Sequence, residues 1–291
     1  MRIIVLMDVD TIKLEYIPDL KDTLFIAGFE GWGNALDVSR GMLDYMIKKT
    51  EAKVFGEINP DYFYRYDEAR PYVHIENGQL KRLTPPGGRV YLASKEITKR
   101  DIVFLKANEP HLNWLKFVRG LLGICEILNI EIIITIGSMY DNVLHSDRIV
   151  SCLASDNELL EMLRSKRVLT INYKGPSAIH STIQSEAQKR GMRCISLWCH
   201  CPYYLQGTTH FGIIAHLGSL ISSIGGFPLD IEELEIAWSE LNKQIQAIVD
   251  KSPELQEMIN QLRKEKIKGT LSPSKKGEKV IRIEDFLKPK S

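Results

Sequence analysis

The sequence predicts an α/β fold, a three-layer α/β/α sandwich built around a mostly parallel sheet. Two observations predict it. Short apolar segments alternate with amphipathic segments from residue 24 to residue 224, the order that builds a parallel sheet covered by helices. Within that region, residues 130–136 are almost continuous isoleucine, which is typical of a strand buried on both faces.

The first unit of this fold lies in residues 24–47. An apolar run at residues 24–27 predicts a buried strand that ends in Gly28, Gly31 and Gly33, and a helical pattern follows. The glycine spacing differs from the dinucleotide fingerprint G-x-G-x-x-G, and no Lys-Ser or Lys-Thr follows as in a P-loop. The turn therefore predicts the scaffold and names no ligand.

The other elements follow in chain order. Apolar runs predict core strands at residues 54–58, 102–105, 130–136 and 194–199, with residues 3–7 as an edge strand or a lead-in. Helical periodicity predicts helices at residues 111–128, 155–162, 177–191 and 208–224. The helix that begins at residue 155 opens with a capping box, Ser155-x-x-Glu158.

A β excursion interrupts this alternation between the second and third core strands. Short β segments are expected at residues 72–76, 81–84 and 89–93, with Asn77-Gly78 as a hairpin turn. We expect the excursion to lie over an edge of the main sheet. The tyrosine-rich stretch before it could bind a partner, although packing is the preferred interpretation.

The pattern changes after residue 226, where a C-terminal helical pair is expected. A seam of apolar residues recurs at spacings of three and four, and Ser252-Pro253 then opens a second helix. Such a pair can fold back on its own body or contact another subunit, and both alternatives remain open. The candidate oligomer or partner contacts are Ile231, Leu234, Trp238, Leu241 and Ile245.

We divide the 291 residues into a core domain (1–226), a helical extension (227–266) and a basic, flexible tail (267–291). From Arg263 onward there are ten Lys or Arg and four Asp or Glu, a net charge of +6, which leaves −5 for the remainder. Such a tail could touch an anionic partner, but a solvated tail is the preferred interpretation, and nucleic acid is not an expected partner.

Composition limits the class and the compartment. The chain is 44% hydrophobic and 26% charged, which is ordinary for a globular protein, and its net charge is +1. No apolar run reaches the ~20 residues that a membrane span needs, and the N-terminal pattern does not predict a signal peptide. Five cysteines, an odd number, favour a reducing cytoplasm over a disulfide framework.

No catalytic residue, metal site or cofactor is predicted. In Cys199-His200-Cys201 the two cysteines of a strand face opposite to the histidine, so the three cannot chelate one ion. Gly137-Ser138-Met139 lacks the G-x-S-x-G pattern of a nucleophile elbow. Small buried cysteines are the better interpretation.

Polar and aromatic residues do recur directly after the predicted core strands. Because the ends of parallel strands meet at one edge of a sheet, these residues could line a ligand pocket there. The alternative is that loops are polar in any case and that aromatic residues cap the sheet. The candidate ligand-binding residues are Trp32, Asn34, Glu109, His111, Tyr140, His145, Tyr173, Gly175 and Tyr203.

Several of these segments, taken in order, resemble the proteasome-assembly-chaperone-two (PAC2) family, in particular its bacterial branch. The matching stretches cover roughly residues 24–262. They are Gly31-Trp32-Gly33-Asn34-Ala35 with Asp37, Glu57-Ile58-Asn59-Pro60 with Phe63-Tyr64, Arg70-Pro71, Glu109-Pro110-His111-Leu112-Asn113-Trp114 with Phe117, Gly137 with His145, Tyr173-Lys174-Gly175-Pro176, and Ser196-Leu197-Trp198 with Pro202-Tyr203-Tyr204.

The resemblance implies a phosphorylase/hydrolase-like sandwich, a homo-oligomer, with a trimer as one candidate, and no accepted catalytic residues. Relatives with a known role bind proteasome subunits. Archaeal relatives do so through a hydrophobic-Tyr-X tail, whereas this sequence ends in Pro289-Lys290-Ser291 without a penultimate tyrosine. That route is therefore not expected here.

Two functions follow as hypotheses. The first is an oligomeric scaffold or assembly-chaperone-like protein that binds a protein partner. The alternative is a small-molecule enzyme, of hydrolase or carboxylate-amine ligase type, with its pocket at the carboxyl ends of the strands. The missing catalytic constellation favours the first, and the polar residues at the strand ends favour the second.

Overall fold

The computed structural model describes residues 11–267. Its centre is a nine-stranded sheet in the order β1-β3-β6-β7-β2-β8-β11-β9-β10. The expected strand at residues 3–7 and the tail from residue 268 onward lie outside the described residues.

Four central strands of this sheet run parallel to one another, so their carboxyl ends lie at the same edge of the sheet. They are β7 (Ile102–Asn108), β2 (Thr23–Glu30), β8 (Ile130–Asp141) and β11 (Arg193–Pro202). On one side the sheet continues antiparallel through β6 (Gly88–Leu92), β3 (Lys53–Ile58) and β1 (Ile12–Leu14). On the other side β9 (Val150–Ala154) is antiparallel to β11, and β10 (Leu169–Thr170) completes the sheet.

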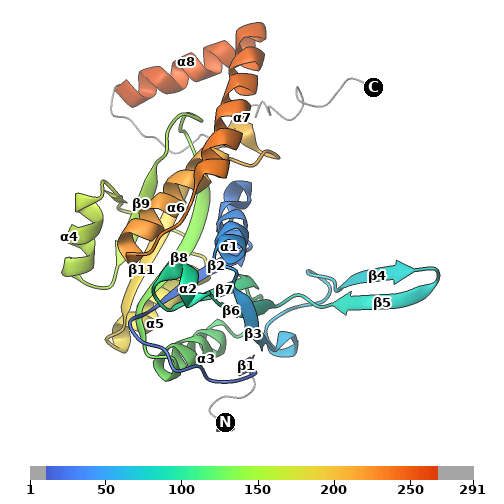
Figure 1. Ribbon diagram of the computed structural model, residues 1–291. Helices are drawn as coiled ribbons and strands as arrows, with labels where there is room; N and C mark the ends of the chain where they lie inside the picture. The colour runs from blue at the N-terminus through green and yellow to red at the C-terminus, as the bar shows by residue number, and fades with distance from the viewer. Residues whose placement is uncertain (1–10, 268–291) are drawn as a thin grey trace.

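Helices cover both faces of the sheet, which confirms the predicted α/β class (Figure 1). The first face carries α1 (Val38–Lys49), α4 (Asn157–Ser165) and α6 (Phe211–Gly225). The second carries α3 (Trp114–Ile127) and α5 (Ile179–Lys189). Each face of the sheet has its own hydrophobic core, and β2 contributes side chains to both. Leu24 and Ile26 lie in the core of the first face, and Phe25 and Phe29 lie in the core of the second.

The predicted core strands are all present, and most are longer than expected. Strand β2 does not end at Gly28 but continues to Glu30. Gly28 packs against α1, where a Cβ atom would come within 2.6 Å of Ser39 Oγ. The Ser39 hydroxyl accepts the Phe29 N–H and donates to the Ile136 carbonyl, so it bridges β2 and β8 where they diverge.

One local prediction was wrong, and one strand was missed. The N-cap of α4 is Asp156 and not Ser155, because the Asp156 carboxylate accepts the N–H of Leu159 at 2.9 Å. Strand β9 was not predicted at all. Its sequence, Val-Ser-Cys-Leu-Ala, is short and weakly patterned, and its pairing with β11 and β10 makes it a strand.

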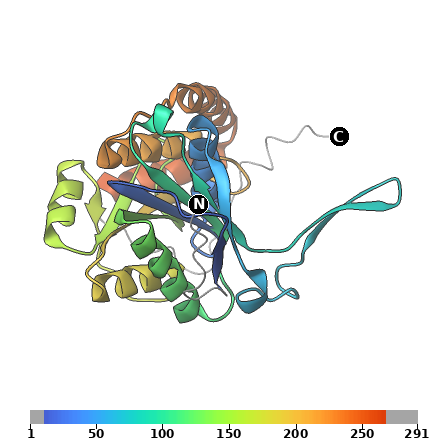
Figure 2. The same ribbon diagram turned by 60° about the horizontal axis from the view of Figure 1, so that its bottom comes forward.

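The β excursion differs from its predicted position. Strands β4 (Tyr72–Glu76) and β5 (Gln79–Thr84) form a separate two-stranded sheet, with Asn77 and Gly78 at positive φ in the turn. This hairpin projects away from the body instead of lying over an edge of the main sheet (Figures 1 and 2). Only the third expected segment, β6, joins the main sheet.

The C-terminal helical pair packs on the chain's own body. Helix α7 (Glu232–Lys251) lies against α6, and α8 (Pro253–Ile267) begins where Ser252 Oγ accepts the Leu255 N–H. Leu234, Trp238, Leu241 and Ile245 are buried in the core of the first face, and Ile231 packs partly buried against it. The apolar seam of α7 therefore faces the chain's own core, which is the fold-back arrangement.

No helix among residues 11–267 is long and apolar enough to cross a membrane.

Candidate functional site

Glu109 is the residue that organises the edge where the parallel strands end. It follows β7 directly, and its two carboxylate oxygens accept different backbone N–H groups. Oε2 accepts the N–H of Trp32 at 2.9 Å and Oε1 accepts the N–H of Ile179, the first residue of α5, at 2.8 Å. One side chain thus joins the segments that follow β2 and β7 to the start of a helix, where a negative charge is favourable.

The backbone of Trp32 is held by this hydrogen bond, whereas the residue as a whole is 63% exposed. Gly31 lets Glu109 approach the turn closely, because a Cβ atom on Gly31 would lie 2.6 Å from Glu109 Oε2. Glu109 therefore fixes the turn and leaves the ring of Trp32 free to contact another molecule.

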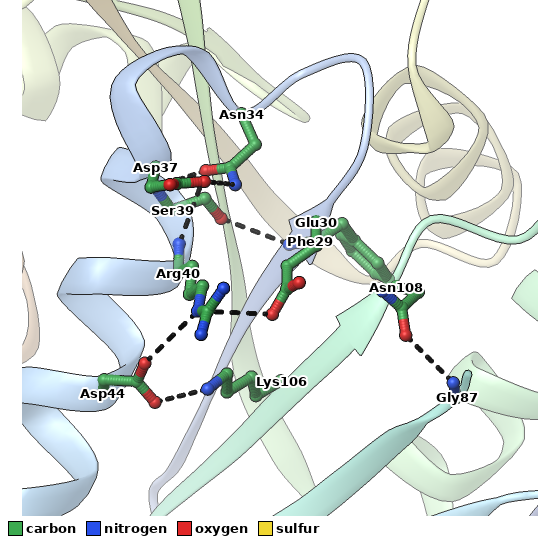
Figure 3. Close-up of polar contacts among 10 residues, drawn as sticks. All are labelled: Phe29, Glu30, Asn34, Asp37, Ser39, Arg40, Asp44, Gly87, Lys106 and Asn108. Carbon is green, nitrogen blue, oxygen red and sulfur yellow. Dashed lines mark hydrogen bonds and ion pairs between the residues drawn. The ribbon is translucent and has the colours of Figure 1, made fainter. Parts of the chain in front are cut away.

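Asn34 serves the start of α1 (Figure 3). Its Oδ1 accepts the N–H of Ser39 at 3.0 Å, and its Nδ2 donates to Asp37 at 3.1 Å. These bonds support Leu36 and Asp37, which both adopt a left-handed backbone conformation with φ of 53°. The amide of Asn34 is thus used within the chain.

The next candidate residues also have partners within the chain, on segments that are distant in the sequence. His111 Nδ1 accepts the N–H of Arg65 at 3.0 Å. Tyr140 stacks on Tyr203 with ring centroids 5.2 Å apart. His145 is buried, which lowers its pKa, and its Nδ1 lies 2.7 Å from the hydroxyl of Tyr204.

The loop before α5 carries the last two candidates. The Tyr173 hydroxyl donates to the Pro176 carbonyl at 2.8 Å, and Gly175 lies against the same hydroxyl. Of the nine predicted ligand-binding residues, the structure joins Trp32 to Glu109, Tyr140 to Tyr203, and Tyr173 to Gly175. Their binding role remains a prediction.

A cavity of about 470 Å³ lies nearby, and none of the nine residues lines it. It is bounded by the ends of β2, β3 and β7 and by the loop before β6. Gly87 in that loop forms two hydrogen bonds with Asn108. The Gly87 N–H donates to Asn108 Oδ1 at 3.0 Å (Figure 3), and the Asn108 backbone N–H donates to the Gly87 carbonyl. The cavity therefore has a rigid wall.

Four charged side chains cross the floor of this cavity in one row. Lys13, Glu57, Arg89 and Lys106 are register neighbours on β1, β3, β6 and β7, and all four line the cavity. Lys106 forms an ion pair with Asp44 of α1 at 2.5 Å. A neighbouring ion pair joins Arg40 to Glu30 at 3.6 Å (Figure 3). Sequence analysis missed this row, because each residue is an ordinary polar position until strand register aligns the four.

A second unpredicted cluster joins β8, β9 and β11. His200 Nδ1 lies 2.7 Å from Asp141 Oδ2, and His200 Nε2 lies 2.9 Å from Ser151 Oγ. The order of groups is that of a Ser-His-Asp triad. Ser151, however, is fully buried in β9, so no substrate can reach its oxygen from the surface. The hydrogen bond from His200 lowers the pKa of Asp141.

The cysteines show no sign of nucleophile activation. All five are buried and free, and burial raises the pKa of Cys194 to about 12. Cys199 and Cys201 point into the core of the first face, on the side opposite to the bonds of His200. Among residues 11–267, no group of three or more His, Cys, Asp or Glu side chains is placed to hold a metal ion.

Comparison with solved structures shows the same fold. A protein of unknown function from Corynebacterium glutamicum is 17% identical, with a TM-score of 0.80 over 88% of this chain and 96% of that one. The proteasome-assembly chaperone homologue Rv2125 of Mycobacterium tuberculosis is 22% identical, with a TM-score of 0.74 over 81% and 99%. The archaeal proteasome activator PbaB of Pyrococcus furiosus is 18% identical, with a TM-score of 0.63 over 82% and 98%.

None of the curated proteins matches the sequence. The model of the PAC2 family matches residues 25–249, from the first buried strand to the end of α7. That range includes every candidate residue named from the sequence. The chain belongs to the PAC2 family.

Proposed function

We propose that this protein is an assembly-chaperone-like scaffold that binds a protein partner and acts as a homo-oligomer. The observation that carries the proposal is the exposed ring of Trp32 on a turn that Glu109 holds in place. Aromatic side chains dominate the binding energy of protein interfaces, and a fixed backbone reduces the entropy lost on binding.

The chemistry around Trp32 supports partner binding over catalysis. The polar groups that an enzyme would present at this edge are used for internal bonds, since Glu109 accepts two backbone N–H groups and Asn34 supports the start of α1. The exposed ring of Tyr173 lies in the loop that leads to Ile179, which is itself bonded to Glu109. Two exposed aromatic residues therefore lie on or next to segments that Glu109 joins.

The printed roles of the relatives suggest which partner to test first. Rv2125 is described as a proteasome-assembly chaperone homologue and PbaB as a proteasome activator. A subunit of a proteasome-type assembly is accordingly the first class of partner to test. We further propose a cytoplasmic location, which the five buried, free cysteines support.

The test is affinity capture of native complexes with the full chain, the Trp32→Ala variant and an Ile236→Ala control. Ile236 lies on α7 and is 61% exposed, which matches Trp32 in exposure. We expect a protein recovered in stoichiometric amount with the wild type and the control but not with Trp32→Ala. Recovery of no stoichiometric protein, or equal recovery with Trp32→Ala, would contradict the proposal.

The charged cavity favours a second candidate function, the binding of a small molecule. Its volume of about 470 Å³ is typical of small-molecule sites, and Lys13 and Arg89 would attract an anionic group. Native mass spectrometry of the purified protein tests this candidate. A bound metabolite present in the wild type and absent from Arg89→Gln would favour it, whereas the absence of any bound metabolite would count against it.

A further inference from the structure

The floor of the charged cavity presents three neighbouring charges that no group of the described chain neutralises. The register places Lys13 opposite Glu57 and Glu57 opposite Arg89, so the charges alternate as positive, negative and positive across β1, β3 and β6. Within residues 11–267 none of these three side chains forms an ion pair or a hydrogen bond. All three are exposed and line the cavity, so a molecule that enters it can reach them.

The other charged residues of the cavity are already paired. Lys106 follows Arg89 in the row and forms an ion pair with Asp44 of α1. Glu30, which also lines the cavity, forms an ion pair with Arg40. Among the described lining residues, the charges left unpaired are therefore two positive and one negative, a net charge of +1. A ligand that neutralises them has a net charge of −1.

The order of the three unpaired charges restricts the ligand more than their sum does. Neighbouring strands lie about 4.8 Å apart, so the backbones of Lys13 and Arg89 are about 10 Å apart, with Glu57 between them. A simple anion such as phosphate, bound between the two cations, would meet Glu57 as a like charge. The row therefore requires a cation that lies between two anions.

An α-amino dicarboxylic acid carries its charges in this order. In aspartate and glutamate the ammonium group lies between the two carboxylates, and the net charge at neutral pH is −1. The ammonium group pairs with Glu57, and the carboxylates pair with Lys13 and Arg89. The guanidinium of Arg89 can bind a carboxylate through two parallel hydrogen bonds, whereas the ammonium of Lys13 acts as a point charge.

The walls of the cavity are held in place within the chain. Gly87 and Asn108 are joined by two hydrogen bonds, and Pro85-Pro86 restricts the backbone of the same loop. At the end of β3, the side chain of Asn59 accepts the N–H of Asp61 at 3.2 Å. A cavity that is formed in advance reduces the entropy lost when a ligand binds.

We propose that this cavity binds a free acidic amino acid, aspartate or glutamate, through Lys13, Glu57 and Arg89. The inference rests on the second candidate function, small-molecule binding, and names the class of ligand. Trp32 does not line the cavity, so the surface proposed for the protein partner stays available.

The test is calorimetric titration of the full chain with L-aspartate, L-glutamate and glutarate. Glutarate has the two carboxylates of glutamate without the ammonium group, so it separates recognition of the whole charge pattern from attraction of an anion. We expect one of the amino acids to bind at least about tenfold more tightly than glutarate, because glutarate loses a charge-assisted hydrogen bond to Glu57.

Two variants assign the residues. Arg89→Gln should weaken the binding of the amino acid at least about tenfold, because a carboxylate loses its bidentate partner. Glu57→Gln should also weaken the binding of the amino acid, yet it should strengthen the binding of glutarate, because the like charge is removed. Both positions are exposed, so we expect each variant to fold with a melting temperature close to that of the wild type.

The matched controls are Arg119→Gln on α3 and Glu240→Gln on α7. Both residues are exposed, and neither lines the cavity. The controls make the same substitutions elsewhere on the molecule, so they should leave all affinities unchanged. Controls that lose as much affinity as the cavity variants would show a general electrostatic attraction and overturn the assignment.

The outcomes separate this inference from the candidate function on which it rests. If neither amino acid binds but native mass spectrometry recovers another small molecule, the ligand class is overturned and small-molecule binding stands. If no small molecule binds or is recovered, both are overturned. Glutarate that binds the wild type as tightly as glutamate, or an amino-acid affinity that Glu57→Gln leaves unchanged, would overturn the role of Glu57 and the proposal with it.

Discussion

Glu109 accepts the backbone N–H of Trp32 at 2.9 Å, across 77 residues of sequence, and so fixes the turn that presents the indole ring. The same carboxylate accepts the N–H of Ile179 through its other oxygen. Glu109, which the sequence named as a candidate ligand-binding residue, therefore joins three segments of the chain through these bonds. The carboxylate is used for bonds within the chain, whereas Trp32 is exposed to solvent.

Replacement of Glu109 should loosen the edge. We expect Glu109→Ala to lower the free energy of unfolding by about 1–3 kcal/mol, because two N–H groups lose their acceptor. Urea denaturation measures this change. Gly31→Ala should act in the same direction, since its Cβ atom would displace the Glu109 carboxylate. Two variants as stable as the wild type would show that the bonds of Glu109 are not needed.

The sequence predicted most of the fold, because the central strands are long apolar runs with strong signals. Residues 130–136 are an example. In the structure this strand begins at the predicted residue and continues at its carboxyl end to Asp141. The weak strand β9 and the position of the β4–β5 hairpin depend on tertiary contacts, which the periodicity of the sequence does not report.

The candidate site was harder to predict, because it depends on register and on hydrogen bonds between distant segments. Trp32 and Glu109 were named separately, and only the structure shows that they are bonded. The row from Lys13 to Lys106 arises from the pairing of β1, β3, β6 and β7, which β2 and the β4–β5 hairpin separate in the sequence. The Asp141–His200–Ser151 cluster likewise needs the unpredicted strand β9.

The buried seam of α7 makes a direct prediction. Trp238 stacks on His210 with ring centroids 4.7 Å apart, and it lies so close to Gly212 that a Cβ atom there would be 2.7 Å away. Trp238→Ala should therefore lower the free energy of unfolding by about 3–5 kcal/mol through the cavity it leaves. Thermal unfolding measures this loss. An unchanged melting temperature, combined with a loss of oligomer, would instead place the seam between subunits.

Two buried histidines should make stability depend on pH. Burial lowers the pKa of His180 to about 4 and that of His210 to about 3, from an ordinary value of 6.5. The unfolded chain takes up these protons below pH 6.5 and the folded chain does not, so stability is constant above that pH and falls as pH decreases toward 4. Each histidine contributes a slope of about 1.4 kcal/mol per pH unit.

The His210→Asn variant tests that slope, measured by urea denaturation between pH 6.5 and 5. Asparagine cannot titrate, yet it can replace His210 as the acceptor of the Ile213 N–H at the start of α6. We expect the slope of the free energy of unfolding against pH to be smaller in the variant, by up to about 1.4 kcal/mol per pH unit. An identical slope in the two proteins would refute the assignment.

The triad-like cluster should behave as structure. Ser151 has no exposed surface, so a fluorophosphonate reagent should not label it in the folded protein. Ser151→Ala should lower the free energy of unfolding by about 1–2 kcal/mol, because His200 Nε2 loses its partner. Stoichiometric labelling of Ser151, detected by mass spectrometry of the native protein, would contradict this interpretation and favour a hydrolase.

The central claim is that the ring of Trp32 binds a protein partner, and calorimetric titration of the purified partner into Trp32 variants tests it most directly. We predict that Trp32→Ala weakens binding by about tenfold or more, that Trp32→Phe retains most of the affinity, and that Ile236→Ala leaves it unchanged. A dissociation constant for Trp32→Ala equal to that of the wild type would contradict the account.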